Sequence, residues 1–416
     1  MMKNKILITK DVLRSDYLNT YNSKSFFKTK NINKLANKGT QFNSYYCSAP
    51  TTSMAMIGMF LGESIHNLDK GSIHDKTSFQ TTNLFSELEN RGVDTHVLWS
   101  EEFKVLASDR IHLFDKKTVE HFAPLGGAVE ISPQNPAFKK IIKKHNNSSN
   151  FDLTKYFYDY IKDISEKKEK WFVWCHCPHV FYPAKSYGED IEIFDNFIGE
   201  IMENIDAEII LSADHGHAKC EKGRVVYGYD VYEPAIKIPL ITPNYFNESN
   251  INFPVSQIQL KNIVLNESLA KDKFVYVDTR YYKQPDRKLA IIHNNYKLIY
   301  DKLNKTEELY DLSYDPNEDI NLLIENFPDF ERKSVYPLNE IIYYPFWNAA
   351  KENYFILKEE KNRIWRTETY FFEKYDQIKT YFKNVKKKGV RWMFRKNRTV
   401  IVWKGRWGST TKIPMH

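Results

Sequence analysis

The chain has 416 residues, of which 42% are hydrophobic and 15% aromatic, so it can bury a large core and intrinsic disorder is excluded. Its four cysteines are too few for a disulfide scaffold, and no run of about 20 apolar residues is present to cross a membrane. The net charge is +7, but residues 351–416 hold 18 Lys and Arg against 6 Asp and Glu. The excess of cations therefore belongs to the C-terminal end. Since the apolar run at the N-terminus is too short for a signal sequence, we expect a cytoplasmic protein.

Apolar strands alternate with helices along the first 250 residues. In chain order we predict a strand at 5–9, a helix and a strand start within 31–42, a helix from Pro50 to about Gly62, a helix and a strand within 84–99, a helix within 152–169, a strand at 170–177, an amphipathic helix at 190–205, and strands at 207–213 and 235–242. This alternation predicts an α/β fold with a mostly parallel sheet and helices on both faces.

The pattern changes after about residue 250, where shorter strands and turns follow one another. We therefore predict three parts: an α/β core at 1–250, a smaller C-terminal sheet subdomain that closes the core at 251–335, and a basic, aromatic extension at 336–416.

Polar residues follow three of the predicted strands. Asp11 follows the first strand, His176 closes a second, and Asp214 and His215 follow a third. In open α/β sheets, sites form beyond the carboxyl ends of the strands. We therefore expect these side chains to lie close together.

Hydroxyl side chains cluster in YYCSAPTTSMAMIGMFLGE, at residues 45–63. Thr51, Thr52 and Ser53 stand where a helix is predicted to begin, and they are candidate nucleophiles or, more simply, helix caps. A helix N-terminus favours an anion in either case. The other candidates also have plain structural alternatives: Asp11 can cap a helix, Asp214-His215-Gly216 can be a polar loop, and His176 and His179 can pack within a loop.

Taken together, these residues form a chemically coherent set. Two carboxylates, one imidazole and one hydroxyl can hold a divalent ion, which lowers the pKa of the hydroxyl and makes it a nucleophile. A further histidine can bind ester oxygens or protonate a leaving group. The set predicts an enzyme acting on a phosphate or sulfate ester with one divalent metal ion (manganese, zinc, magnesium or calcium).

The order of the segments resembles the sulfatase branch of the alkaline phosphatase superfamily, over roughly residues 3–325. The resemblance covers the opening strand with its metal Asp, the nucleophile segment, the helix and strand after it, the histidine loop and its helix, the second metal segment, the strand after it and the closing motif. In this chain these are ILITKDVLRSDYL, SAPTTSMAMIGMFLGESIHN, LFSELENRGVDTHVLWS, HCPHVFYPAKSYGEDIEIFDNFIGEIM, IILSADHGH, YEPAIKIPLI and YKLIYDKLNKTEELYDLSYDPNEDINL.

The chain departs from formylglycine sulfatases at several positions. Counting back ten residues from Gly62 places Thr52 at the nucleophile position, and Thr cannot become formylglycine. Met56 stands where those enzymes have Arg, and Lys10 precedes Asp11 where they have a second Asp. The segment YGYDVYE, at residues 227–233, replaces a His-containing motif.

The set is more similar to the single-metal phosphotransferases of the superfamily, the lipoteichoic acid synthases and phosphoethanolamine transferases, which form a phosphothreonine intermediate. That resemblance implies Thr52 as nucleophile and metal ligand, with three further metal ligands, Asp11, Asp214 and His215. It implies His176 as a catalytic residue that contacts the substrate, and we assign His179 and Thr51 to substrate binding.

The expected substrate is an anionic ester, on a glycan or a lipid-linked sugar. Residues 384–407 interleave Lys and Arg with Trp and Phe, which fits a packed terminal subdomain or contact with a membrane surface or a polysaccharide, with nucleic acid the least favoured partner. The alternative is a non-catalytic protein of the same fold that binds an anionic glycan or a membrane surface. Metal ligands at three separate strand ends favour the enzyme, because a binding protein does not need them.

Overall fold

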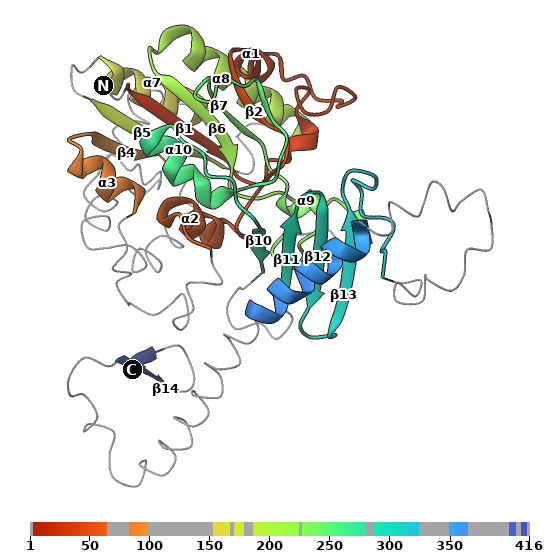
Figure 1. Ribbon diagram of the computed structural model, residues 1–416. Coiled ribbons are helices and arrows are strands. Elements are labelled where there is room, and N and C mark those ends of the chain that lie inside the picture. Colours follow the sequence, from red (N-terminus) through yellow and green to blue (C-terminus); the bar gives the residue numbers. More distant parts are fainter. Residues whose placement is uncertain are drawn as a thin grey trace.

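The computed structural model describes most of the α/β part and a second, smaller sheet (Figure 1). The described residues are 3–64, 83–98, 153–166, 170–178, 186–223, 227–279, 287–323, 349–364, 399–404 and 409–413. The predicted fold class, a mostly parallel sheet with helices on both faces plus a smaller C-terminal sheet, is confirmed. No helix in these ranges is long and apolar enough to cross a membrane.

The large sheet has seven strands in the order β4-β5-β1-β6-β7-β2-β8. Their bounds are β1 Lys5–Lys10, β2 Gly39–Phe42, β4 Asp94–Leu98, β5 Trp171–Cys177, β6 Glu208–Ala213, β7 Leu240–Pro243 and β8 Asn250–Ile251. Strand β1 lies between β5 and β6 and is parallel to both, whereas β7 is antiparallel to its two neighbours. Every residue of β1 is buried, as expected for a central strand that is covered on both faces.

One predicted strand is shorter than expected. The sequence predicted a strand over 235–242, but helix α9 occupies Glu233–Ile236 and β7 begins only at Leu240. Pro234 lies in the first turn of α9, where its fixed φ suits a helix. Pro239 has no N–H to give to a sheet, so the strand starts after it.

Helices cover both faces of the large sheet (Figure 1). Helices α2 (Thr52–Leu61), α3 (Leu84–Asn90) and α10 (Leu260–Asn266) pack together on one face, and α1 (Lys30–Lys38), α7 (Leu153–Ser165) and α8 (Tyr187–Asn204) on the other. Alternation along β1 sends neighbouring side chains to different faces. Lys5 therefore reaches the carbonyl of Val264 in α10, while Lys10 forms an ion pair with Asp190 in α8.

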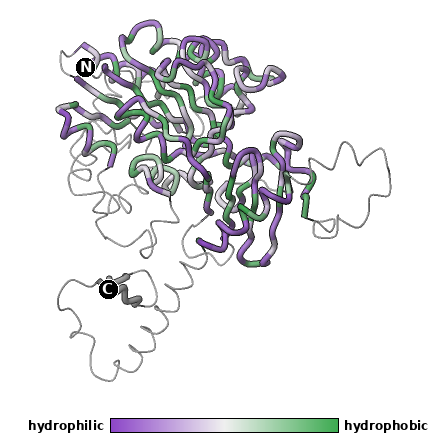
Figure 2. The backbone as a smooth tube through the Cα atoms, viewed as in Figure 1, coloured by the Kyte–Doolittle hydropathy of each residue, from purple (hydrophilic) through white to green (hydrophobic). Residues whose placement is uncertain are grey.

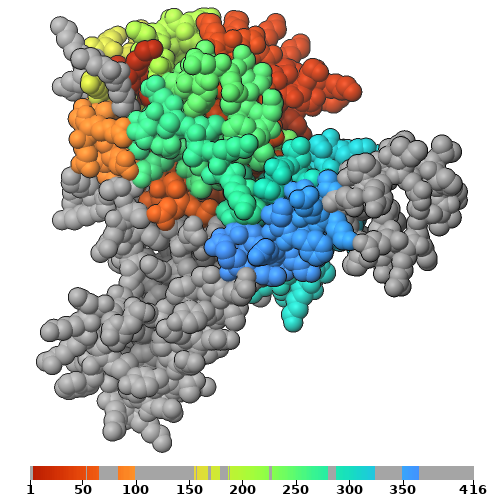
Figure 3. All heavy atoms as spheres, in the orientation of Figure 1, coloured from red at the N-terminus to blue at the C-terminus, as the bar shows by residue number. Residues whose placement is uncertain are grey.

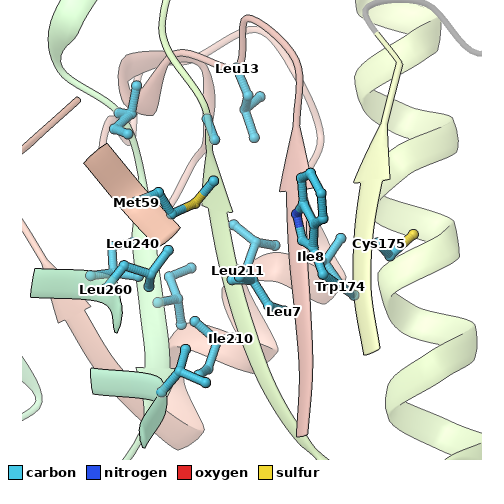
Figure 4. Packing of buried hydrophobic residues seen from close by; sticks show 14 of the residues in the cluster. Leu7, Ile8, Leu13, Met59, Trp174, Cys175, Ile210, Leu211, Leu240 and Leu260 are labelled. Carbon is cyan, nitrogen blue, oxygen red and sulfur yellow. The ribbon is translucent and has the colours of Figure 1, made fainter. Parts of the chain in front are cut away.

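The core lies between the strands and these helices. Hydrophobic residues concentrate in the sheet strands (Figure 2), and Figure 4 shows Leu7, Ile8 and Trp174 among the buried side chains on β1 and β5. The ring of Phe60 in α2 lies edge-on to Trp174, with centroids 4.6 Å apart. Such contacts fix α2 on the sheet, and the position of α2 sets the position of its first residue, Thr52.

The second sheet is antiparallel and has four strands, in the order β10 (Val275–Asp278), β11 (Lys288–His293), β12 (Tyr296–Asp301) and β13 (Thr306–Asp311). The helix at residues 349–364 lies across it (Figures 1 and 3) and forms a separate apolar cluster with it. Tyr354 and Lys361 of this helix both contact Glu307 in β13. The division of the chain at residues 250 and 335 remains a proposal, and residue 335 lies outside the described ranges.

Shorter elements complete the described chain. They are β3 (Tyr45–Tyr46) paired with β9 (Val255–Ser256), the hairpin of β14 (Thr399–Lys404) and β15 (Ser409–Ile413), and the 3₁₀ turns η1 (Ser15–Tyr17), η4 (Glu221–Gly223) and η5 (Gln257–Gln259).

A buried charge cluster joins the two sheets. Lys297 in β12 lies with its Nζ 3.1 Å from Glu233 Oε1 in α9 and 2.6 Å from Glu318 Oε1. The backbone N–H of Glu233 donates to the other oxygen of Glu318 at 2.7 Å. Because all three side chains are buried, the lysine compensates two carboxylates that water cannot reach.

Replacing Lys297 with Met should therefore destabilise the protein by about 3–5 kcal/mol, because the buried Glu318 carboxylate would lose its cation and Glu233 would keep only Lys237, at 3.7 Å. Urea unfolding followed by circular dichroism measures the effect. The exposed Lys24, changed to Met, is the matched control and should shift the free energy of unfolding by less than about 0.5 kcal/mol. Equal stability of the two variants would contradict this account of how the sheets are joined.

Candidate active site

The candidate residues gather where β1, β5 and β6 end. Asp11 directly follows β1, His176 is the sixth residue of β5, and Asp214 and His215 directly follow β6. These three strands are parallel neighbours, so their carboxyl ends open onto the same edge of the sheet. Within the described part of the chain, Asp11, Asp214 and His215 form a group whose ligand atoms all lie within 4.8 Å of one another.

Asp214 is fixed through one of its two carboxylate oxygens. Its Oδ1 accepts hydrogen bonds from the backbone N–H groups of Val12, at 3.1 Å, and His215, at 2.8 Å. Its Oδ2 and Oδ1 of Asp11 are buried, and neither has a hydrogen-bond partner among the described residues. These two oxygens lie 3.4 Å and 3.7 Å from Nε2 of His215. Two carboxylate oxygens therefore converge on one ring nitrogen.

The hydrogen bond on the far side of the ring fixes the tautomer of His215. Its Nδ1 lies 2.8 Å from the carbonyl oxygen of Gly216, which can only accept, so Nδ1 carries the proton. Burial lowers the pKa of His215, which favours the neutral ring. The lone pair of Nε2 then faces the two carboxylates and the Thr52 hydroxyl, whose Oγ1 lies 3.1 Å away. This is the tautomer that a metal-binding histidine needs.

Without a cation, this arrangement is electrostatically unfavourable. Burial, followed by the charge of Asp214, raises the pKa of Asp11 to about 8. Burial also raises the pKa of Asp214 to about 6. A divalent ion among the unpaired oxygens, Nε2 and the Thr52 hydroxyl would remove the penalty on both carboxylates. The donor set therefore fits one divalent metal ion.

Thr51 and Thr52 open helix α2, as predicted. Thr51 is the N-cap residue, with extended backbone angles, but its side chain makes no capping hydrogen bond. Its Oγ1 is buried and has no hydrogen-bond partner in the described chain. The alternative that Thr51 serves as a side-chain cap is therefore wrong, and its side chain leaves the first N–H groups of α2 to other acceptors.

Cys47 is the other nucleophile type in this segment, and its surroundings make it inert. It is fully buried, its backbone N–H donates to the carbonyl of Ile236, and burial raises the pKa of its thiol well above the usual range. A neutral, buried thiol is a poor nucleophile.

His176 is held on β5 beside Thr9 of β1. Its Nδ1 lies 2.7 Å from Thr9 Oγ1, which also accepts a hydrogen bond from Trp174 Nε1 at 2.9 Å. Burial, then the charges of His215 and Lys10, lowers the pKa of His176 to about 3. The ring is therefore neutral at physiological pH. His179, the other predicted substrate-binding histidine, lies outside the described residues.

Gln257 is a positioning residue that the sequence did not reveal. Its Nε2 donates to the carbonyl oxygens of Ala213, at 3.1 Å, and Asp214, at 2.9 Å. Its Oε1 accepts from the backbone N–H of Ser48 at 3.1 Å. One buried amide thus ties the Asp214 loop to the segment that carries Thr52. No local sequence pattern marks this residue, because its partners lie more than 40 positions away.

Gly216 lets the Asp214 loop approach α9. A Cβ at this position would collide with the carbonyl oxygen of Pro234, and the Gly216 N–H donates to Ala235 at 2.9 Å. The close approach explains why glycine follows the Asp-His pair here.

Comparison with known proteins identifies similar chains. The model of the family described as Sulfatase matches residues 3–244. The phosphonate monoester hydrolase of Agrobacterium radiobacter has a TM-score of 0.57 at 12% identity, over 85% of this chain and 96% of that one. Ps i-CgsB in complex with k-i-k-neocarrahexaose has a TM-score of 0.55 at 15% identity, over 80% of this chain and 92% of that one. BT1596, a 2-O GAG sulfatase, has a TM-score of 0.56 at 11% identity, over 85% of this chain and 94% of that one. A sequence search of curated proteins finds no match.

The likeness to these solved structures shows a shared fold. The family model, in contrast, spans more than half of the chain and includes all three strand ends at which the candidate residues lie, those of β1, β5 and β6.

Changing Gln257 to Leu should cost at least about 2 kcal/mol of stability, because the buried Asp214 carbonyl oxygen and Ser48 N–H lose their bonds to the amide, and the Ala213 carbonyl keeps only the Ser212 hydroxyl, at 3.3 Å. Gln259, two residues along, is half-buried, so water can replace its hydrogen bond to Asp272. Gln259→Leu is therefore the control and should cost less than half as much. Thermal or urea unfolding of both variants measures the difference, and similar losses would argue against the positioning role.

Proposed function

We propose that this chain cleaves or transfers a phospho- or sulfo-ester group through Thr52. The proposal proceeds from two findings: the chain belongs to the sulfatase family, and it is an ester-cleaving enzyme. Asp11, Asp214, His215 and Thr52 would together hold one divalent metal ion. The observation that carries the proposal is the Nε2 lone pair of His215, which faces two unpaired carboxylate oxygens and lies 3.1 Å from the Thr52 hydroxyl. Family membership favours this enzyme over the non-catalytic binding protein.

A bound divalent ion would lower the pKa of the Thr52 hydroxyl and neutralise charge on the ester oxygens. The Thr52 hydroxyl gives its proton to solvent water, and its oxygen forms a bond to phosphorus or sulfur while the bond to the leaving oxygen breaks. That leaving oxygen takes a proton from water. The oxygen of water or of an acceptor hydroxyl then bonds to phosphorus or sulfur and gives its proton to solvent, while the bond to Thr52 breaks and the Thr52 oxygen takes a proton back. Water as acceptor makes the enzyme a hydrolase, and a sugar or lipid hydroxyl makes it a transferase.

Two further groups are proposed to bind the ester oxygens. The N–H groups at the start of α2 can donate to oxygens whose negative charge grows in the transition state. Because His176 is neutral, we assign it a hydrogen bond to the ester rather than the role of a general acid. Thr51 Oγ1, buried beside the nucleophile, is assigned to the same oxygens, and His179 is assigned to substrate binding from the sequence alone.

The donor set favours Mn²⁺ or Zn²⁺ over Ca²⁺ or Mg²⁺. Ca²⁺ and Mg²⁺ prefer sites made only of oxygen atoms, whereas an imidazole nitrogen beside two carboxylates suits the transition metals. Only one imidazole belongs to this group of described residues, which supports one metal ion rather than a two-zinc centre.

An anionic glycan ester is the proposed substrate class. It is supported by two structures of the same fold, one of which holds a carrahexaose while the other is described as a 2-O GAG sulfatase. The basic residues 384–407 were predicted to contact such a polymer or a membrane surface. Most of them lie outside the described residues, so their contact with a glycan remains a proposal from sequence.

Purified protein should retain about one Mn²⁺ or Zn²⁺ per chain, measured by inductively coupled plasma mass spectrometry. Asp214→Asn should weaken the binding of that ion at least about tenfold, because the amide keeps the shape of the side chain but loses its charge. Asp206→Asn, at an exposed position, is the control and should bind as the wild type does. A wild-type chain that binds no divalent ion after incubation with either metal would contradict the proposal.

Thr52→Ala should reduce turnover by at least about a thousandfold on whichever of p-nitrophenyl phosphate, bis-p-nitrophenyl phosphate or p-nitrophenyl sulfate the wild type cleaves. Thr52→Ser keeps the hydroxyl and should retain measurable activity. Unchanged thermal unfolding of both variants shows that the fold is intact. Loss of activity in Thr51→Ala together with full activity in Thr52→Ala would assign the nucleophile to Thr51 instead.

A further inference from the structure

An exposed aromatic side chain borders the reacting group. The ring of Tyr227 packs on the ring of His215, with centroids 4.7 Å apart and planes inclined by 35°, and meets His217 edge-on at 5.6 Å. Because His215 Nε2 lies 3.1 Å from Thr52 Oγ1, Tyr227 stands one side chain away from the proposed nucleophile. Its segment, YGYDVYE, is the one that departs from the family's His-containing motif, and the proposed reaction gives it no role.

The backbone beside Tyr227 packs against Pro50 and Thr51, the two residues before the proposed nucleophile Thr52. Gly228 has a φ of +90°, and a Cβ there would lie 2.9 Å from Thr51 Cγ2 and 3.8 Å from the Pro50 carbonyl oxygen. Only glycine combines this conformation with so close an approach. Two residues later, buried Asp230 accepts a hydrogen bond from Lys288 Nζ at 2.7 Å. The backbone that carries the two tyrosines is therefore held at Gly228 and at Asp230, and the Tyr227 ring is held by the two imidazoles.

Both tyrosines keep a large share of their surface in solvent. Tyr227 is 40% exposed although it packs on two imidazole rings, and Tyr229 is 50% exposed. Aromatic rings are costly to leave in water, and here the rings stand beside a buried group of metal ligands. A large apolar surface next to a polar centre is the usual composition of a ligand-binding site.

The surroundings of the two rings favour a sugar over an acyl chain. Tyr227 is 40% exposed and Tyr229 is 50% exposed, so a ligand stacked on either ring would itself stay partly in water. A pyranose ring has an apolar C–H face that can stack on a tyrosine and hydroxyl groups that water can hydrate. An acyl chain on the same rings would leave much of its apolar surface in water, which costs free energy.

We propose that Tyr227 and Tyr229 form a stacking subsite for the pyranose ring that carries the ester group. This inference rests on the proposed function and names the substrate class of the same site. Tyr227 would stack on the sugar that bears the reacting ester, and Tyr229 would contact the same ring or the next one along a glycan.

The test compares two esters that differ in the ring alone. Glucose 6-phosphate holds a pyranose, whereas sorbitol 6-phosphate has the same carbon atoms and ester position in an open chain; the matching 6-sulfates serve if the enzyme prefers sulfate. Tyr227→Ala should lower kcat/KM for the pyranose ester about tenfold and for the open-chain ester less than about twofold. Tyr227→Phe keeps the ring and should remain within about twofold of wild type on both. Tyr314→Ala, at a 70% exposed tyrosine, is the matched control.

Equal losses on both esters would overturn the subsite, because the side chain would then act on the site as a whole. A larger loss on adenosine 5′-phosphate than on glucose 6-phosphate would overturn the sugar assignment in favour of a base.

A binding measurement separates failure of the subsite from failure of the proposed function. Saturation-transfer NMR of glucose 6-phosphate on Thr52→Ala protein requires no turnover, and it should show transfer to the C–H hydrogens of the sugar ring. The signal should fall at least about threefold when Tyr227→Ala is added. If wild type cleaves no ester, the proposed function fails, and this signal still decides whether a sugar stacks on Tyr227. An unchanged signal overturns the subsite.

Discussion

The two oxygens of the Asp214 carboxylate have different tasks, and the geometry of the site depends on that division. Oδ1 binds the N–H groups of Val12 and His215, so it joins the loop after β1 to the loop after β6. Val12 has a φ of +54°, a conformation that a β-branched residue rarely adopts. The hydrogen bond to Asp214 helps to hold this strained backbone, and it places Asp11 with its free oxygen facing His215. Oδ2 has no hydrogen-bond partner among the described residues.

The distribution of buried charge distinguishes this site from the rest of the core. Other buried carboxylates face a cation or accept backbone N–H groups with both oxygens. Asp190 pairs with Lys10, Glu318 with Lys297 and Asp278 with Arg287, and Asp315 accepts from the N–H groups of Asp319 and Ile320. Asp11 and Asp214 instead face the lone pair of a neutral imidazole. Lys10, although adjacent to Asp11 in sequence, points to the opposite face of the sheet and is engaged by Asp190 and the carbonyl of Pro178. The missing positive charge at the strand ends is what a divalent ion would supply.

Contacts between distant segments also hold residues 48–52 against the remainder of the site. Gln257 connects the backbone of Ser48 to that of Asp214, and the loop at Gly228 packs on Thr51. Thr52 is therefore positioned by segments that lie far from it in sequence. A threonine hydroxyl is an ordinary group, and the reactivity proposed for Thr52 depends on the carboxylates, the imidazole and the helix N-terminus that the fold brings to it.

Local periodicity determined much of this protein without reference to its tertiary structure. The apolar runs at 5–9 and 170–177 are strands and the amphipathic pattern at 190–205 is a helix, because burial on two faces or on one stripe leaves a direct mark on the residue order. The sequence also placed Asp11, His176, Asp214 and His215 at strand ends, and strands that are parallel neighbours bring those ends together. Their roles in the reaction remain proposals.

Tertiary structure alone decided the features that join distant segments. The tautomer of His215, the bridging amide of Gln257, the pairing of Lys297 with two glutamates and the packing of Tyr227 on His215 depend on partners that no short window of sequence contains. Periodicity records whether a side chain is buried, but it does not record which atom that side chain meets. Those contacts are fixed only when the strands and helices have been assembled.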